Sequence, residues 1–303
     1  MGFFRSGKEF SMRKGEYVIF CIEFKCNSDC PICSIDNLRD DSKAISFPVY
    51  KAVLKHCVDK YSGIIFSGGE VTLNSQLPEF ISYAKEEGFR NIMIQTNGRV
   101  LSDIRKVEEL RSAGATQFFV SFHTSYKDLS EKMAKRTGSY VQTVNGLQNL
   151  EKLGLEVITN TVVTGMNYQG LYATARFLSQ FNNITEMHFW GFVPLSAESS
   201  QLMLPYVLAA PYLNRTIGYV ESLNRKVCVK YFPFCLLEPS YRCLLDNSQS
   251  KVLGIRDDFW KKWENCDFKT YACCEGTDCM GLPMINKGKM SSEKWVPITA
   301  SSE

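Results

Sequence analysis

Three cysteines lie close together near the start of the chain, in the segment Cys26-Asn-Ser-Asp-Cys30-Pro-Ile-Cys33. They directly follow an apolar run, residues 17–24, of the kind that forms a buried strand. A cubane iron–sulfur cluster needs four ligands, so three thiolates in one loop leave one iron open for chemistry. A structural zinc site usually takes four ligands, often as paired CxxC sequences, which this spacing does not supply. The triplet therefore favours an iron–sulfur cluster, with zinc as the alternative.

A second segment that could contact a ligand is the apolar run 63–66 followed by Ser67, Gly68, Gly69 and Glu70. Glycines at the end of a strand let the backbone approach a ligand closely because they carry no Cβ. The carboxylate of Glu70 would favour an amino group there. Taken alone, this pattern is an ordinary turn between a strand and a loop. Its position one helix length after the cysteine triplet favours a shared site.

The two motifs together resemble those of the radical S-adenosylmethionine (radical SAM) superfamily. The resemblance implies that Cys26, Cys30 and Cys33 hold a 4Fe–4S cluster whose fourth iron chelates SAM through its amino and carboxylate groups. It extends over about residues 17–195, and the further matching segments are Gln95-Thr-Asn97-Gly98, Val120-Ser121-Phe-His123, Thr159-Asn160-Thr-Val-Val163 and Asn167. The family usually has an aromatic residue before the third cysteine, near the adenine, whereas this chain has Ile32.

The resemblance also implies a reaction. One electron, supplied by an external donor such as flavodoxin or ferredoxin, would cleave SAM to methionine and a 5′-deoxyadenosyl radical. That radical would take a hydrogen atom from the substrate, while the protein orients the reactants and excludes water.

The resemblance assigns roles to single residues as well. Ser67, Gly68, Gly69 and Glu70 would contact the methionine amino group, with Asn97 also in the SAM site. Further SAM contacts would come from Ser121 and Asn160 to the ribose or carboxylate, and from Phe192 and Val193 to the adenine. The role of His123 stays open, because it could line the substrate pocket, donate to the carboxylate or be structural.

Short β-branched or aromatic runs alternate with amphipathic segments, which predicts an α/β fold. We expect strands at 17–23, 63–66, 91–95, 116–122, 156–163 and 186–193, and helices at 47–60, 76–87, 102–113, 139–153 and 168–181. Glycines 88, 114 and 154 follow three of these helices, where a left-handed cap suits glycine. Short links between alternating elements indicate parallel strands. Six such units can curl into a partial barrel, and the resemblance implies the same (β/α)6 partial TIM barrel.

This arrangement would bring the candidate residues together, since active-site groups of parallel barrels gather where strands end and loops begin. Each of the motifs falls at or near the end of a predicted strand. We expect a lead-in at 1–16, the barrel at 17–195, a cysteine-rich extension at 196–282 and a loose tail at 283–303. A helix is predicted at 207–224 of the extension, followed by an apolar run at 227–231.

Seven of the twelve cysteines lie after residue 227, and none lies between Cys57 and Cys228. The C-terminal group resembles the cysteine-rich (SPASM- or twitch-like) extensions of many radical SAM enzymes. This implies a second 4Fe–4S cluster, for which we expect the ligands Cys235, Cys266, Cys273 and Cys279, with Cys274 and Cys243 as alternatives. A zinc site or no metal are the other interpretations. Cys235 or Cys274 could instead supply a hydrogen atom to a substrate radical.

The composition limits the possible partners. The chain of 303 residues has 35 basic and 32 acidic residues, a balance that argues against a nucleic-acid-binding protein. It has no apolar run of the roughly 20 residues that a membrane helix needs and no signal peptide, so we expect no membrane association. Twelve cysteines without an export signal favour the reducing cytoplasm and metal binding over disulfides.

The substrate is the least determined part of the prediction. Relatives with such an extension often modify ribosomally made peptides by crosslinking or epimerisation, which we place first. A small metabolite (a sugar, nucleoside or antibiotic precursor) is the alternative, because only about 16 residues precede the first strand and no leader-peptide recognition domain is expected there. A non-catalytic iron–sulfur electron carrier or SAM-binding protein is the third possibility.

Overall fold

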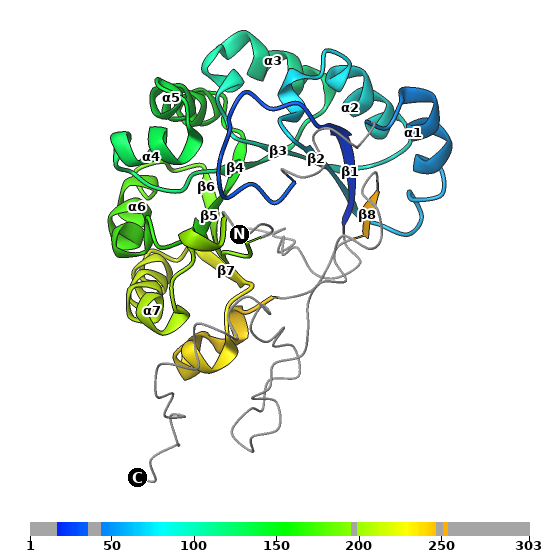
Figure 1. Cartoon of the computed structure of the whole chain (residues 1–303). Helices are drawn as coiled ribbons and strands as arrows, with labels where there is room; N and C mark the ends of the chain where they lie inside the picture. The colour runs from blue at the N-terminus through cyan, green and yellow to red at the C-terminus, as the bar shows by residue number, and fades with distance from the viewer. Residues whose placement is uncertain (1–16, 36–43, 195–198, 247–250, 254–303) are drawn as a thin grey trace, which may run out of the picture.

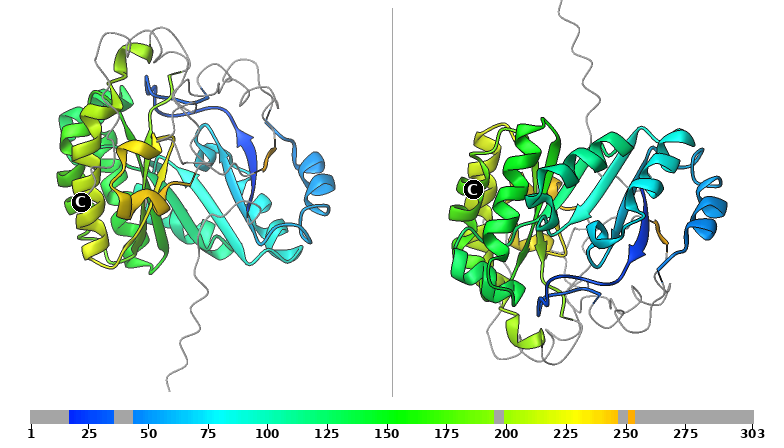
Figure 2. Two further views of the ribbon diagram at one scale, coloured as in Figure 1. Left: turned by 90° about the horizontal axis from the view of Figure 1, so that it is seen from below. Right: turned by 90° about the horizontal axis from the view of Figure 1, so that it is seen from above.

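The computed structural model describes residues 17–35, 44–194, 199–246 and 251–253. Its strands form one parallel sheet in the order β7-β6-β5-β4-β3-β2-β1-β8. The sheet is curved, and helices α1 to α7 follow one another around its convex side (Figure 1). The perpendicular views show the same arrangement, with the strands inside the arc of helices (Figure 2). The architecture is thus the partial α/β barrel that the sequence predicts.

The bounds of the elements follow the predicted alternation closely. The strands are β1 (Tyr17–Glu23), β2 (Gly63–Gly68), β3 (Asn91–Thr96), β4 (Gln117–Ser121), β5 (Glu156–Val163), β6 (Ile184–Gly191), β7 (Lys226–Lys230) and β8 (Lys251–Leu253). The helices are α1 (Phe47–Leu54), α2 (Leu77–Glu86), α3 (Ile104–Ala113), α4 (Lys127–Ala134), α5 (Ser139–Lys152), α6 (Leu171–Leu178) and α7 (Tyr206–Ser222).

Two features go beyond the prediction from the sequence. Helix α4 was not among the expected elements; its sequence Lys127–Ala134 has four charged residues and only one buried side chain, Met133. The sheet also continues past the six expected strands, because β7 pairs in parallel with β6 and β8 pairs in parallel with β1. The run at 227–231 that we placed in the extension therefore adds a strand to the barrel sheet.

Side-chain alternation along the strands separates two apolar regions. One set of residues packs between the sheet and the helices, as Val18, Phe20 and Ile22 of β1 do. The other set faces the inside of the barrel and forms a smaller cluster of Tyr17, Ile65, Met93, Phe119 and Ile158. Residues two apart on a strand share a face, so the second set defines which side chains reach the lumen.

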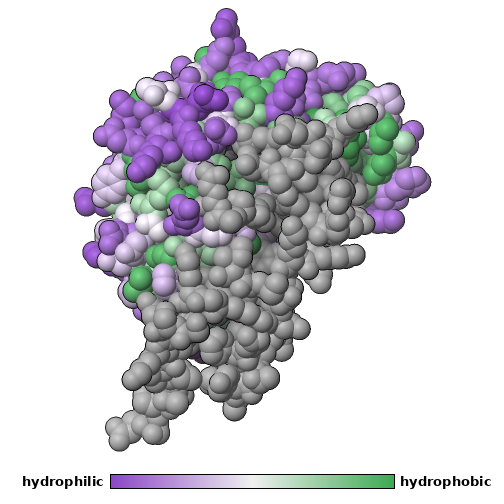
Figure 3. All heavy atoms as spheres, in the orientation of Figure 1, coloured by the Kyte–Doolittle hydropathy of each residue, from purple (hydrophilic) through white to green (hydrophobic). Residues whose placement is uncertain are grey.

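The helices cover the outer face as amphipathic elements. In α2 the predicted inward side, Phe80, Ile81 and Ala84, is buried, and Lys85 and Glu86 are exposed. The glycines after α2, α3 and α5 have positive φ angles of 111°, 125° and 65°, as expected for helix caps. Hydrophilic residues dominate the outer rim near α3 and α5 in Figure 3. Within the described part of the chain, none of the helices has the length and apolarity required to cross a lipid bilayer.

Candidate active site at the carboxyl ends of the strands

The loop that carries the cysteine triplet follows β1 directly. Its backbone turns at the second and third cysteines, where the Cys33 N–H donates to the Cys30 carbonyl at 3.1 Å. The Cys26 sulfur accepts from the Ser28 backbone N–H at 3.4 Å. All three thiols are partly exposed. A hydrogen bond to a cysteine sulfur stabilises its thiolate form, which is the form that binds iron.

The glycines of the second motif bring the end of β2 against the end of β1. The Gly69 N–H donates to the Glu23 carbonyl at 2.6 Å, and the Glu70 N–H donates to the Lys25 carbonyl at 2.9 Å. A Cβ on Gly68 would lie 2.0 Å from the Glu23 carbonyl oxygen, and φ at Gly68 is +136°. The sequence predicts close approach of this backbone to a ligand. The structure shows close approach to the loop that carries the cysteines.

Glu70 is fully buried and joins the loops after β2 and β3. Its carboxylate accepts hydrogen bonds from the hydroxyls of Thr72 at 2.5 Å and Thr96 at 2.6 Å. It also accepts from the backbone N–H groups of Thr72 at 3.2 Å and Asn97 at 2.7 Å. Burial raises the pKa of Glu70, and these donors act against the rise. Glu70 therefore fixes the two loops to each other, and its contact with the methionine amino group of SAM stays a prediction.

Asn97 and Arg99 connect the loop after β3 to the cysteine loop. The Asn97 side-chain amide donates to the Asn27 side-chain oxygen at 2.7 Å and lies 3.9 Å from the Cys26 sulfur. The Arg99 guanidinium donates to the Asn27 carbonyl and, at 3.1 Å, to the Ser28 hydroxyl. Sequence reasoning missed Arg99 and Asn27. Neither has a periodic signal, although both lie within one or two residues of a motif that was found.

The predicted ribose or carboxylate contacts, Ser121 and Asn160, are neighbours in register on β4 and β5. The Asn160 side-chain oxygen is buried and has no hydrogen-bond partner in the structure. Leaving such an acceptor without a donor costs about 1–3 kcal/mol, so native proteins seldom do so without a reason. Ser67 on β2 differs, because its hydroxyl donates to Gln95 at 2.8 Å.

His123 and Asn167 hold the ends of β4 and β5 together. The His123 Nδ1 accepts from the Val162 N–H at 3.3 Å, and burial lowers the pKa of His123 to about 4. The ring is therefore neutral at neutral pH. The Asn167 side chain donates to the carbonyls of His123 at 2.8 Å and Val162 at 2.9 Å. These contacts favour the structural interpretation that the sequence left open for His123.

An apolar cluster lies between the cysteine loop and the end of β6. Ile32, Met133 and Phe192 form it, and partly buried Cys30 packs against it. The Tyr206 hydroxyl donates to the Phe192 carbonyl at 2.8 Å, which fixes the chain just after β6. Val193 is partly exposed beside it. Ile32, which replaces the usual aromatic residue, thus lies beside Phe192, which we predict to contact adenine.

The described residues include two of the six candidate ligands for a second cluster. Cys235 and Cys243 lie in the 3-10 turns Phe234–Leu236 and Pro239–Leu244, and both are exposed. Cys266, Cys273, Cys274 and Cys279 lie outside the described residues, as do the lead-in at 1–16 and the tail at 283–303.

These observations together test whether the site fits a 4Fe–4S cluster and SAM. Three partly exposed cysteines share one loop, and hydrogen bonds from the loops after β2 and β3 hold that loop in place. An unpartnered buried acceptor, Asn160, lies at the same end of the sheet. Thiolates are the ligands that iron–sulfur clusters use. The residues present fit the group.

Comparisons with known proteins agree with this description. The family model described as the radical SAM superfamily matches residues 24–178, just over half of the chain. The chain is 29% identical over 180 residues to the 7,8-dihydro-6-hydroxymethylpterin dimethyltransferase of Methanocaldococcus jannaschii, covering 57% of this chain and 35% of that protein. It is 29% identical over 165 residues to a probable GTP 3′,8-cyclase of Sulfolobus acidocaldarius, covering 54% of this chain and 51% of that protein.

The Fe-coproporphyrin III synthase of Methanosarcina barkeri matches a longer part, with 25% identity over 238 residues, 78% of this chain and 58% of that protein. The chain therefore spans between about a third and three fifths of these curated relatives. Among solved structures, Streptococcus suis SuiB bound to its precursor peptide SuiA has a TM-score of 0.58 at 17% identity, covering 71% of this chain and 48% of that one. Methylornithine synthase has a TM-score of 0.55 at 16% identity, covering 79% of this chain and 71% of that one.

Proposed function

Because this chain belongs to the radical SAM superfamily of enzymes, which use a 4Fe–4S cluster and SAM, we propose that it abstracts a hydrogen atom from a substrate bound at the mouth of its barrel. The cluster, when bound, supplies the electron that cleaves SAM into methionine and a 5′-deoxyadenosyl radical. The observation that carries the proposal is the cysteine loop itself, in which Cys26, Cys30 and Cys33 are all partly exposed. Three thiolates on one cubane cluster would leave its fourth iron to SAM.

The roles of the surrounding residues follow from their contacts. Cys26, Cys30 and Cys33 hold the cluster, while Glu70 and Asn97 fix the orientation of their loop. Asn160 accepts a hydrogen bond from SAM through its unpartnered oxygen. Ile32 and Phe192 give the adenine an apolar surface and exclude water from it. An external carrier such as flavodoxin or ferredoxin delivers the electron.

Anaerobic reconstitution with iron and sulfide tests the proposal. With dithionite and SAM, the wild-type chain should form 5′-deoxyadenosine, and Cys30→Ala should form none. Cys57→Ala is the matched control, because Cys57 is a buried thiol in the apolar core between the sheet and the helices. It should retain both iron and nucleoside formation. Equal nucleoside formation by Cys30→Ala and wild type would contradict the ligand assignment.

The cysteine-rich extension is proposed to hold a second 4Fe–4S cluster through Cys235, Cys266, Cys273 and Cys279, with Cys274 and Cys243 as alternatives. Its cofactor content can be measured directly. A single cluster gives about four irons per chain and two clusters give about eight. Cys235→Ala should lower the iron content by about four in the second case while leaving SAM cleavage measurable.

We propose a small metabolite, rather than a peptide, as the substrate. The three curated relatives have names that refer to a pterin, GTP and Fe-coproporphyrin III, and these matches rest on sequence identity of 25–29%. The barrel lumen also carries the buried side chain of Asn160, whose oxygen has no hydrogen-bond partner in the structure and suits hydrogen bonding to a small molecule. Peptide modification is the second candidate, because SuiB with its bound precursor peptide shares the fold.

Substrate class can be separated by size and by protease. Cell extract of the source organism is divided into a low-mass fraction and a peptide fraction, and each is added to the reconstituted enzyme. Stimulation of 5′-deoxyadenosine formation by the low-mass fraction supports a metabolite. Stimulation by the peptide fraction that disappears after protease treatment supports a peptide. Extract from cells grown in deuterated medium should transfer deuterium into 5′-deoxyadenosine in either case.

A further inference from the structure

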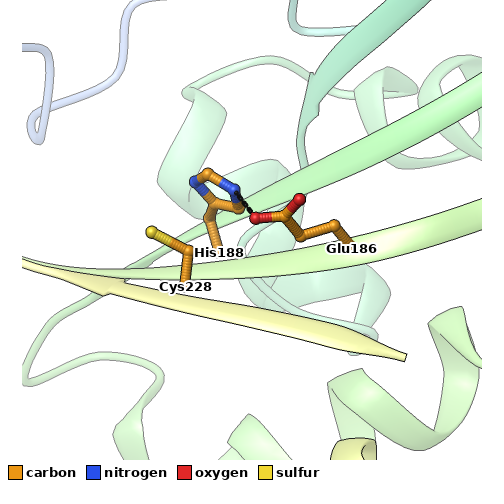
Figure 4. A group of neighbouring side chains, drawn as sticks. All are labelled: Glu186, His188 and Cys228. Carbon is orange, nitrogen blue, oxygen red and sulfur yellow. Dashed lines mark hydrogen bonds and ion pairs between the residues drawn. The ribbon is translucent and has the colours of Figure 1, made fainter. Parts of the chain in front are cut away.

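Three buried ionisable side chains meet on the inner face of the sheet at β6 and β7. Glu186, His188 and Cys228 are 6%, 1% and 8% exposed. Glu186 and His188 are two residues apart on β6, so they share a face, and Cys228 is the register partner of His188 on β7. Their ligating atoms all lie within 4.8 Å of one another (Figure 4). None of the predicted site residues belongs to this group.

The order of the three groups is that of an activated nucleophile. The His188 Nε2 and the Glu186 Oε1 are 2.7 Å apart. The Cys228 sulfur lies on the opposite side of the imidazole from the carboxylate (Figure 4). When an imidazole lies between a thiol and a carboxylate, the carboxylate orients the ring and the ring can take the proton of the thiol. Because the carboxylate and the sulfur flank the ring on opposite sides, the arrangement suits proton transfer better than shared ligation of one metal ion.

Cys21, a second cysteine that faces the inside of the barrel, is a comparison for Cys228 because it has no histidine beside it. Cys21 on β1 is 2% exposed and packs among Ile19, Phe24 and Ile35. Burial without a basic partner raises the pKa of Cys21 to about 12, so this thiol stays protonated. Cys228 is similarly buried and differs in having His188 beside it. For His188 itself, burial would lower the pKa, but Cys228 and Glu186 outweigh it and raise the pKa to about 9.

We propose that Cys228 is a nucleophile in the barrel lumen that adds to an electrophilic conjugated alkene of a bound molecule, with His188 as its base and Glu186 as the group that orients His188. The thiol proton moves to the His188 Nδ1, and the thiolate sulfur forms a bond to the β carbon of the alkene. The imidazolium then returns its proton to the resulting enolate. The product is a thioether, and the step needs neither an oxidant nor a reductant.

Trp190 favours a different protonation state of His188, in which Nδ1 carries no proton. Its indole Nε1 lies 3.4 Å from the His188 Nδ1, a long contact that forms a hydrogen bond only when that nitrogen carries no proton. In that state the ring is neutral and donates from Nε2 to Glu186, and Cys228 remains a thiol. The two states differ in the proton at Nδ1, which can be observed directly.

The first test is the rate at which a small alkene electrophile, N-ethylmaleimide, modifies each cysteine of the folded full-length chain, mapped by peptide mass spectrometry. Cys228 should react at least about tenfold faster than Cys21, which is also buried, since thiolate and not thiol is the nucleophile. His188→Phe should remove most of this difference, and Glu186→Gln should reduce it less. A Cys228 rate no greater than that of Cys21 would overturn the proposal, because a thiol that this probe cannot reach or alkylate cannot serve a larger substrate.

The second test does not depend on the variants folding. The chain has only three histidines, His56, His123 and His188, so selective 15N-histidine labelling gives few signals. At neutral pH we expect both His188 nitrogens to carry protons in the wild-type protein, and Cys228→Ala to return the ring to a neutral form. A neutral His188 in the wild type would show that the Trp190 contact wins and that Cys228 is not activated. Neither test requires SAM cleavage, so this inference can fail while the proposed function stands.

Discussion

The two halves of the barrel mouth are built in different ways. At the ends of β1, β2 and β3, polar groups are paired within the protein, and the Glu70 carboxylate alone accepts four hydrogen bonds. Along β5, β6 and β7, the buried Asn160 side-chain oxygen has no partner, and the pairing of Glu186 with His188 leaves the Cys228 sulfur on the other side of the imidazole ring. The first half is a rigid support, and the second is equipped to meet a bound molecule.

The two halves therefore differ in role: the first positions the cysteine loop, and the second would bind a ligand. A cluster loop must keep its ligands in one geometry, and satisfied hydrogen bonds with close backbone contact achieve this at a gain in stability. A binding wall must leave donors and acceptors available, which costs stability until a ligand arrives. Substitutions in the first half should therefore change folding most. Those in the second half should change binding or pH dependence most.

The largest effect is expected at Glu70. Glu70→Ala removes the acceptor of four hydrogen bonds in a fully buried site and should lower the free energy of unfolding by about 3 kcal/mol or more. Urea unfolding of the cluster-free protein measures this without interference from iron. Reconstituted Glu70→Ala should also bind less iron, because without the Glu70 carboxylate the loops after β2 and β3 are no longer fixed to each other. Glu79→Ala, on the first turn of α2, is the control and should stay within about 0.5 kcal/mol of wild type.

The next largest effect is expected in the half formed by β5, β6 and β7, where the free energy of unfolding should depend on pH. The charged groups that face the His188 ring are Glu186 and Cys228, and they raise the pKa of His188 to about 9 from an ordinary value near 6.5. A raised pKa gives stability that is fully present below the unfolded value and is lost as pH rises through the folded value. Because the Cys228 thiol supplies the proton that His188 holds, the folded pair and the unfolded chain carry the same number of protons between about pH 6.5 and 8.5. We therefore expect the free energy of unfolding to stay flat there and to fall only as pH rises through about 9, and we expect Cys228→Ala to lack this fall. Unfolding curves at a series of pH values measure it, and identical profiles for the two proteins would contradict this account.

The sequence predicted the first half better than the second, for a physical reason. Cysteine spacing and the Gly68-Gly69 pair are local patterns, and a local pattern is readable from a single chain. The contact of Asn97 with Asn27 and the register of Cys228 with His188 join residues 70 and 40 positions apart, so no spacing rule contains them. Strand β7 was recognised as an apolar run, but its place beside β6 depends on pairing that only the folded sheet shows.

A smaller loss of stability is expected at Gly69 of the second motif, where it would come from the close packing of its backbone against the cysteine loop. Gly69→Ala would place a Cβ 2.4 Å from the Lys25 carbonyl oxygen, so the start of the cysteine loop must move and stability should fall by about 2 kcal/mol. Gly154→Ala is the matched control. Gly154 has a φ of +65° but no atom within 4 Å of an added Cβ, so it should cost about 1 kcal/mol from backbone strain alone. Thermal unfolding of both variants checks the difference. Equal losses would mean that the contact with the cysteine loop can relax without cost.

The smallest effect on folding, and the sharpest contrast with Glu70, is expected at Asn160. Its side-chain oxygen is buried without a partner, so Asn160→Ala removes an unsatisfied acceptor and should leave the free energy of unfolding within about 1 kcal/mol of wild type. The affinity for SAM should fall by about tenfold, since one hydrogen bond to a ligand is worth about 1.4 kcal/mol in that case. Equilibrium binding of SAM to the reconstituted, unreduced enzyme measures it. A large loss of stability with unchanged SAM affinity would place Asn160 with the supporting half of the mouth, and the division between the two halves would then have to be drawn at β6.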